Sequence, residues 1–234
     1  MNKTETFIEL YKELEELAVN RYGYPADGRA VYQLLRRPEF KKLREELDYC
    51  REVRNLLQHR KRLGDSFPVE PSGAMLDLLR TVIARVEAPP RAKDIQVPFS
   101  QVLWKTLEDR VRPTMLEMER RGFSHIPILD RGAVTGVFSE NTVFTCLLDG
   151  EITGIGEELC FADLRSWLPP EKHRSESFRF IREDKLVFEI SEMIDQAQDR
   201  HDRIGLFFTT ANGRSAEPIR GILTAWDVAG AIGA

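Results

Sequence analysis

"HIPILDRGAVTGVFS", residues 125–139, is the stretch of sequence that decides the fold. Two β-rich runs, 125–130 and 133–139, are separated by the dipeptide RG. Such runs, joined by a short connection that contains glycine, predict a β-hairpin. A second pair of β-rich runs, 203–209 and 218–224, lies further along the chain with a longer polar loop between them. We therefore expect two strand pairs in the C-terminal two-thirds of the chain.

The two strand pairs belong to a larger internal repeat. Residues 101–118 align without a gap with 176–193, and residues 136–147 align with 221–232. Each copy is therefore predicted to fold as strand–helix–strand–strand–helix. A duplicated unit of this size usually packs against its own copy, because each half buries its sheet face on the other.

The first 90 residues differ, because their apolar residues recur at helical spacing. This periodicity predicts helices over residues 1–20, 29–36, 39–63 and 74–86. Gly64 is expected to end the third helix, and Pro89 with Pro90 marks the clearest domain boundary. The predicted fold class is α+β, an α-helical bundle followed by two β-α-β-β-α repeats. The expected domains are residues 1–88 for the helical domain, 91–150 for the first repeat and 158–234 for the second.

The composition narrows the class of protein. The chain has 234 residues, of which 42% are hydrophobic and 31% charged, as in ordinary globular proteins. Apolar runs fall well short of the roughly 20 residues that a membrane span needs, and no secretory signal is visible. Cys50, Cys146 and Cys160 match neither a disulfide framework nor a zinc-ligand spacing. We expect a cytoplasmic protein with reduced thiols, no membrane partner and no metal.

A short motif begins the last helix of each copy. In the second copy it is GILTAWD, residues 221–227, with Thr224 at the end of a strand. Free backbone N–H groups at the start of a helix favour an anion, and the Thr224 hydroxyl could bind a phosphate. Asp227, one turn later, could accept two hydrogen bonds from a ribose diol. The alternative is that Thr224 only caps the helix and Asp227 is a favourable first-turn acid.

The repeat, with its HIPILD strand, its hairpin and the motif Gly–apolar–apolar–Ser/Thr–x–x–Asp, resembles the CBS domain. This domain is named for cystathionine β-synthase and occurs in tandem pairs, and the resemblance covers about residues 91–234. It implies that an adenine nucleotide (ATP, ADP, AMP or a related signalling nucleotide) binds in a cleft between the copies. CBS pairs also serve as dimerisation modules without a ligand, so a homodimer is expected and a ligand-free module stays open.

The resemblance implies one nucleotide site centred on Thr224 and Asp227, and the alternative is degenerate pockets with another ligand. The strand around Ile204 could supply an apolar wall and backbone polar groups for an adenine. The first copy of the motif is GVFSENT, residues 136–142, and it lacks the aspartate. The first copy offers three candidate contacts: Ser139 for a phosphate, Thr142 in place of the aspartate, and His125 near the predicted cleft.

The helix predicted over 39–63 carries an arginine in its apolar stripe. The stripe consists of Leu43, Leu47, Cys50 and Leu57, and Arg54 lies within it. Asn55 and His59 are four residues apart, on a face displaced from the stripe. Arg54 and His59 are about 140° apart around the helix axis, so one helix cannot easily aim both at one point. Two such helices that meet across a two-fold axis could form a shared cleft.

The sequence "VRNLLQHR" (residues 53–60) resembles the motif of the HEPN superfamily of helical bundles, many of which are metal-independent ribonucleases that act as dimers. The resemblance implies that His59 is a general acid/base, that Arg54 holds the scissile phosphate and that Asn55 orients one of them. Residues 29–62 hold 11 basic against 5 acidic residues, so RNA could bind along the basic helix 51–62. Alternatively, Arg54 snorkels out of a core and His59 caps the helix end.

Three functions stay open at this point. The first is a regulatory protein that binds an adenine nucleotide between its repeats and controls the helical domain or its dimer. The second is a ribonuclease gated by that nucleotide, and the third is a dimerisation module without a ligand.

Overall fold

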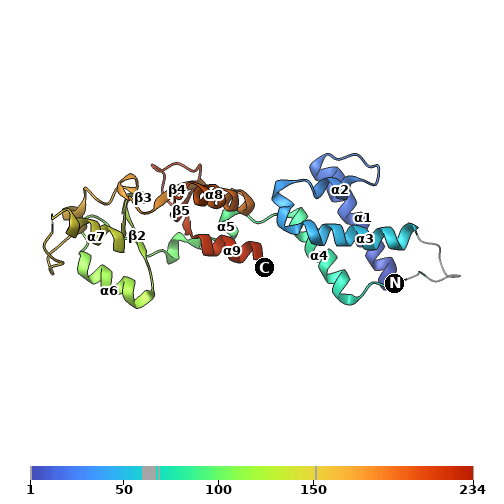
Figure 1. The fold of residues 1–234 in the computed structure, drawn as a ribbon, viewed down its shortest axis with the longest axis horizontal. Helices are drawn as coiled ribbons and strands as arrows, with labels where there is room; N and C mark the ends of the chain where they lie inside the picture. The colour runs from blue at the N-terminus through green and yellow to red at the C-terminus, as the bar shows by residue number, and fades with distance from the viewer. Residues whose placement is uncertain (1, 60–66, 68, 151, 234) are drawn as a thin grey trace. The chain divides into compact units, whose positions relative to one another are not determined.

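The structure is a computed structural model that describes residues 2–59, 67, 69–150 and 152–233. The chain divides into two compact units, Met1–Pro90 and Arg91–Ala234. The first is helical and the second combines helices with strands, which confirms the predicted α+β fold class (Figure 1). We describe each unit by itself.

The first unit is a bundle of helices. They are α1 (Lys3–Tyr22), α2 (Ala30–Leu34), the 3-10 helix η1 (Pro38–Leu43), α3 (Arg44–His59) and α4 (Gly73–Glu87). The ends of α1 follow from its sequence: the Asn2 side chain accepts a hydrogen bond from the Glu5 backbone N–H, and Gly23 ends the helix at φ 70°. Ser72 caps α4 by accepting from the Met75 N–H.

The helix predicted over 39–63 differs at its start. Its first turns form η1, and the α-helix begins only at Arg44. A 3-10 helix has three residues per turn, so it places Phe40 and Leu43 on one side, where both are buried in the core. The predicted end at Gly64 lies outside the described residues.

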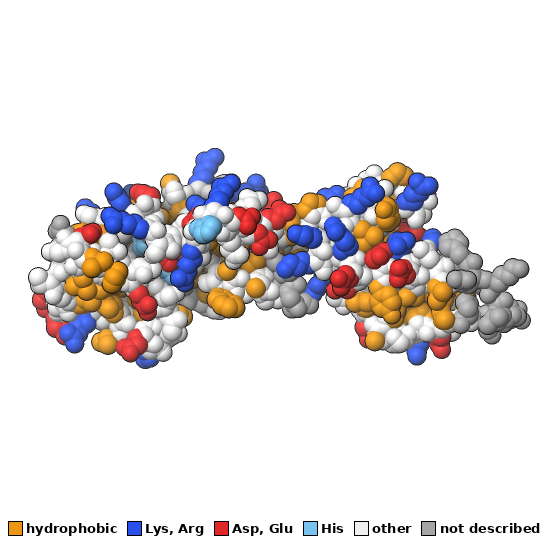
Figure 2. All heavy atoms as spheres, in the orientation of Figure 1, with side chains coloured by type: hydrophobic (Ala, Val, Ile, Leu, Met, Phe, Trp, Pro, Cys, Tyr) orange, Lys and Arg blue, Asp and Glu red, His pale blue; other side chains and the backbone are white. Residues whose placement is uncertain are grey.

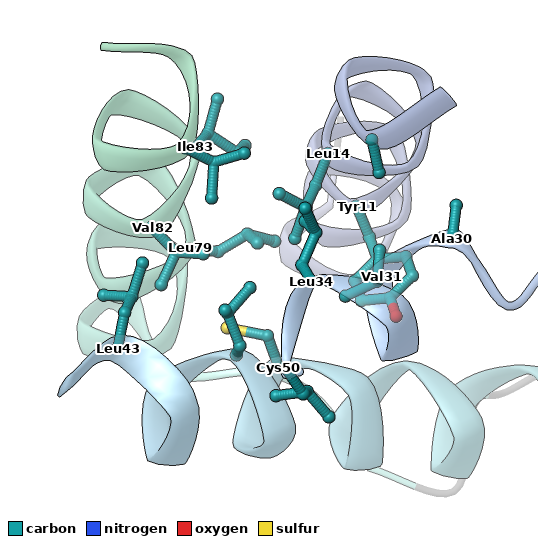
Figure 3. Packing of buried hydrophobic residues seen from close by; sticks show 14 of the residues in the cluster. Tyr11, Leu14, Ala30, Val31, Leu34, Leu43, Cys50, Leu79, Val82 and Ile83 are labelled. Carbon is teal, nitrogen blue, oxygen red and sulfur yellow. The ribbon is translucent and has the colours of Figure 1, made fainter. Parts of the chain in front are cut away.

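The core of the first unit lies where α1, α3 and α4 pack together (Figure 3). The predicted stripe of α3 is confirmed, because Leu43, Leu47, Cys50 and Leu57 are all buried. Leu14 of α1 and Leu79 of α4 meet this stripe from the other helices. Burial raises the pKa of the Cys50 thiol to about 12, so this cysteine is a packing residue rather than a reactive one.

The second unit contains two sheets. A four-stranded sheet has the order β1 (Val97–Pro98), β6 (Gly221–Leu223), β5 (Ile204–Thr210) and β4 (Ser177–Arg182). A two-stranded sheet consists of β2 (His125–Asp130) and β3 (Ala133–Ser139). The predicted hairpin 125–139 is confirmed, with antiparallel pairing from His125↔Ser139 to Asp130↔Ala133. Arg131 and Gly132 form its turn with φ of 50° and 84°.

Helices flank and connect these strands. The α-helices are α5 (Ala92–Ile95), α6 (Val111–Arg121), α7 (Glu140–Leu148), α8 (Val187–Asp199) and α9 (Ala225–Gly233). The 3-10 helices are η2 (Phe99–Gln101), η3 (Phe161–Leu164) and η4 (Pro170–Lys172). In the second copy, β4, α8, β5, β6 and α9 follow one another as predicted: β4 is parallel to β5, and β5 is antiparallel to β6.

The first copy keeps this order, but its first strand is reduced to a single bridge. Lys105 pairs in parallel with Ile128, through a backbone bond to Pro127 and one from Leu129. The reason is that the preceding residues, Val97–Pro98, pair with β6 of the other copy and the chain then turns through η2. The two copies are therefore interlocked, because the sheet of the second copy includes a strand from the first.

Candidate functional site

A pocket of about 810 Å³ lies in the second unit, within the size range of small-molecule sites. The first copy contributes residues of the segments 97–103 and 122–125 to its lining. The second copy contributes α8, the beginning of β5, β6 and the first turn of α9. Both copies therefore line this pocket, and the resemblance to the CBS domain implies a ligand cleft between the copies.

Thr224 and Asp227 lie in the wall of this pocket at the beginning of α9. The Thr224 backbone N–H and its hydroxyl both donate to Asp227 Oδ2, each over 2.7 Å. The capping interaction considered from the sequence is therefore present. It leaves the pair at the pocket surface, both half-buried, with Asp227 Oδ1 as the carboxylate oxygen not used by these two bonds.

The remaining walls are apolar with a few polar groups. Ile204, named from the sequence, lies in the pocket with Ile194 of α8 and Ile222 of β6. Phe123 and Trp226 are large apolar side chains of the lining that are exposed. Such a surface suits a flat aromatic ring more than a strongly hydrated group.

His125 lines the side of the pocket that the first copy contributes. Its Nε2 lies 2.6 Å from Glu176 Oε2, and its Nδ1 lies 2.7 Å from Ser124 Oγ. The Glu176 side chain is only 2% exposed. Burial by itself would raise the pKa of Glu176, but the hydrogen bonds with His125 and Ser139, together with the nearby His173 ring, hold it well below its usual range. The carboxylate is therefore ionised although it is buried.

Ser139 and Thr142 lie outside the residues that line this pocket. Both are buried, and the Ser139 backbone N–H donates to Thr142 Oγ1 over 3.0 Å. The Ser139 hydroxyl donates to Glu176 Oε1 over 2.9 Å. Of the six nucleotide-contact candidates, the structure thus brings four to the pocket (Thr224, Asp227, Ile204 and His125) and keeps two in a closed interior.

Glu176 is the residue that sequence reasoning missed. The gapless repeat alignment pairs it with Gln101, and Gln101 lines the pocket. The sequence alone does not show that Gln101 lines a pocket, so the alignment by itself gave no signal for Glu176.

Arg54 and Asn55 lie together on α3, whereas the side chain of His59 is outside the described residues, as are residues 60–62. Arg54 donates from Nη1 to Asn55 Oδ1 over 3.3 Å and from Nη2 to Glu15 Oε1 over 3.4 Å. Its guanidinium lies 5.6 Å from the centre of the Tyr11 ring. Arg54 therefore links α3 to α1. Its side chain is 17% exposed, so its charged group is held between the helices rather than extended into water as in the snorkelling alternative.

Arg54→Ala is expected to destabilise the helical unit by about 2 kcal/mol, because it removes a half-buried ion pair and a cation–π contact. Hydrogen exchange measured on peptides of α1 and α3 reports the stability of the helical unit separately from that of the second unit. Arg80→Ala is the matched control, since Arg80 pairs with Asp77 at an exposed site. It should change exchange little. Equal effects of the two substitutions would contradict a structural role of Arg54.

Among the residues that the structure describes, no group of three or more His, Cys, Asp or Glu side chains is arranged to hold a metal ion. The absence of a metal stays an expectation. In the same part of the chain, every helix is too short or too polar to cross a membrane.

Comparisons with family models and with curated proteins found no match to the sequence. Solved structures similar to the C-terminal part of the chain are those of CBS-domain proteins. CbpB in complex with c-di-AMP is 16% identical, with a TM-score of 0.45 over 62% of this chain and 85% of that one. CBSX2 in complex with AMP is 14% identical, with a TM-score of 0.44 over 60% and 94%.

A CBS domain-containing protein of Bacillus anthracis is 18% identical, with a TM-score of 0.40 over 62% of this chain and 93% of that one. The resemblance of the helical unit to HEPN proteins stays a hypothesis.

Proposed function

We propose that the second unit binds an adenine nucleotide in the pocket and that the protein is regulatory rather than catalytic. One observation carries the proposal: the motif residues Thr224 and Asp227 lie in an 810 Å³ pocket lined by both copies of the repeat. The proposal is supported by residues of this chain. The ligands c-di-AMP and AMP are named for CbpB and CBSX2, and they are ligands of those two proteins.

The pocket offers a separate group for each part of a nucleotide. Asp227 would accept hydrogen bonds from the ribose hydroxyls through its carboxylate. The other backbone N–H groups at the N-terminus of α9 would hold a phosphate. The Thr224 hydroxyl donates to Asp227, so it would join them only by turning its proton from that carboxylate toward the phosphate. The adenine would lie against Ile204, whose strand also supplies backbone groups at the pocket. These contacts all belong to the second copy. Because residues of the first copy, among them Phe123 and Ser124, also line the pocket, a bound nucleotide would touch both copies and stabilise their packing.

Asp227→Ala is expected to weaken binding of AMP, ADP or ATP about tenfold or more, because a charge-assisted hydrogen bond is lost. Thermal shift measures this directly, since a ligand at 100 times its Kd stabilises the folded state by about 2.7 kcal/mol. A wild type whose melting temperature is unchanged by every nucleotide would contradict the proposal.

Asp163→Ala is the matched control. Asp163 also caps a helix start, by accepting from the Cys160 backbone N–H over 2.9 Å, but it lies outside the pocket lining. Loss of a cap should lower the melting temperature in both variants. Only Asp227→Ala should change the nucleotide response, and an equal response in both would mean that Asp227 is a cap and no more.

Nucleotide control of the helical unit, or of a homodimer, is the finer part of the proposal. Exposed apolar side chains suited to a dimer contact lie on α7, where Phe144 is 63% and Leu148 is 70% exposed. Figure 2 shows hydrophobic atoms at the surface in this part of the second unit. The ribonuclease alternative stays a hypothesis, because Arg54 is engaged within its own unit.

A further inference from the structure

A buried cluster of ionisable groups lies next to the pocket and has no part in the proposed nucleotide contacts. It consists of Glu176, His125, His173 and Ser139, and it reaches the pocket through Ser124. We propose that Glu176 and His125 are positioning residues that turn the Ser124 hydroxyl into a donor toward the ligand. The pocket then selects phosphorylated nucleotides over uncharged nucleosides. This inference rests on the proposed function.

The first step concerns charge. An ionised carboxylate only accepts hydrogen bonds, so His125 Nε2 must donate to Glu176. The His125 and Glu176 side chains are 9% and 2% exposed, and a buried negative charge is tolerated only beside a positive partner. His125 is the nearest candidate, at 2.6 Å, and charge-assisted hydrogen bonds are shorter than neutral ones.

The second histidine is placed less well to neutralise Glu176. His173 Nδ1 lies 3.7 Å from Glu176 Oε1, beyond hydrogen-bond distance. Its Nε2 lies 3.1 Å from the Val137 carbonyl oxygen, which can only accept, so this nitrogen carries a proton. A neutral His173 ring therefore satisfies its backbone partner, and the positive charge is assigned to His125.

Ser124 is the next residue in this series of hydrogen bonds. A charged His125 ring carries protons on both nitrogens, so Nδ1 donates to Ser124 Oγ across 2.7 Å. The hydroxyl proton of Ser124 is then directed elsewhere, and Ser124 lines the pocket. With a neutral ring, the one remaining proton stays on Nε2 for Glu176, and Nδ1 accepts from Ser124. Ser124 would then offer only lone pairs to a ligand, which a phosphate does not bind.

The cluster is held from both copies. Glu176 Oε1 accepts from Ser139, the N-cap of α7 and the repeat counterpart of Thr224. In the first copy, the Glu176 carboxylate thus lies at the N-terminus of α7. The equivalent position in the second copy is the N-terminus of α9, which we assign to a phosphate. On the other side, a Cβ at Gly205 would lie 3.1 Å from both Glu176 Oε2 and His125 Nε2. A larger residue at this position would have to push the pair away by a few tenths of an ångström.

Other charged groups near His125 belong to the pocket. His201, Asp202 and Arg203 precede β5 and line it, and Asp202 forms an ion pair with Arg179. Asp227 lies at the start of α9. The phosphate of AMP itself gains negative charge as the pH rises past about 6, so variants must be compared at the same pH.

Isothermal titration of AMP and of adenosine into the full chain at pH 6 and pH 8 tests the proposal. We expect the wild type to prefer AMP at pH 6, and Ser124→Ala to lose about tenfold of that preference. Ser124 is exposed, so this variant should fold. Ser100→Ala, an exposed serine outside the pocket lining, is the matched control and should behave as the wild type. An unchanged preference in Ser124→Ala would overturn the inference.

A second measurement needs no ligand. Nitrogen-15 NMR of the histidine rings shows directly whether both nitrogens of His125 are protonated at pH 6. We expect a charged ring in the wild type and a neutral ring in Glu176→Gln. A neutral wild-type ring would overturn the inference while the proposed function stood. A wild type that bound neither AMP nor adenosine would instead remove the proposed function, and the selectivity with it.

Discussion

Gly221→Ala is expected to destabilise the second unit by about 3 kcal/mol, the upper range for a forced contact in a packed interior. A Cβ at this position would lie 2.5 Å from the Val97 carbonyl oxygen and 2.7 Å from Gln96 Oε1. Neither atom can easily move, because Val97 pairs with β6 and Gln96 accepts a hydrogen bond from Thr209. The substitution should separate β1 from its sheet and thereby remove one wall of the pocket.

Tryptophan fluorescence makes this effect measurable for one unit alone. The chain has three tryptophans, Trp104, Trp167 and Trp226, and all lie in residues 91–234. Urea unfolding followed by their emission therefore reports the second unit. Gly230→Ala is the matched control, since a Cβ there would meet nothing within 4 Å and alanine favours a helix. It should stabilise by about 0.5–1 kcal/mol. Similar values for both variants would contradict a close approach at Gly221.

Gly136 shows how far the repeat in the sequence predicts the packing. It occupies the same motif position in the first copy, and a Cβ there would lie 2.6 Å from Leu168 Cβ. The alignment predicts that the two glycines are equivalent. It does not predict that a strand of the first copy crosses into the sheet of the second, because that pairing joins residues more than a hundred positions apart.

The pocket shows the same division between local and distant information. Thr224 and Asp227 are found from a seven-residue motif, because the chemistry of a helix start is local. Glu176 escapes the motif, since its importance depends on His125 and Ser139 from the other copy. The alternatives for Arg54 likewise depended on Glu15 and Tyr11, which belong to a different helix. Local patterns therefore predict elements and caps, and the structure is needed for partners.

Glu176→Ala is the second change for which a large effect is expected, about 3 kcal/mol at pH 7, because it removes one partner of a buried charged pair. The destabilisation caused by Glu176→Ala should be smaller at acidic pH. The pKa of Glu176 in the folded state lies well below its ordinary value of 4.5. A carboxylate with a lowered pKa contributes stability above the ordinary value, and that contribution is lost as the pH falls. The wild type should therefore lose stability faster than the variant from about pH 5 downward.

Urea unfolding followed by tryptophan emission between pH 7 and pH 3 measures this difference. Glu217→Ala is an informative control, because hydrogen bonds from Asn212 lower the pKa of Glu217 to about 2 although that residue is exposed. If burial is what makes Glu176 important, Glu217→Ala should leave the unfolding midpoint at pH 7 nearly unchanged. A Glu176→Ala protein that is as stable as the wild type at pH 7, with the same acid limb, would show that the histidines do not depend on this carboxylate. The placement of a charged His125 beside the pocket would then fail as well, since both conclusions require the same buried pair.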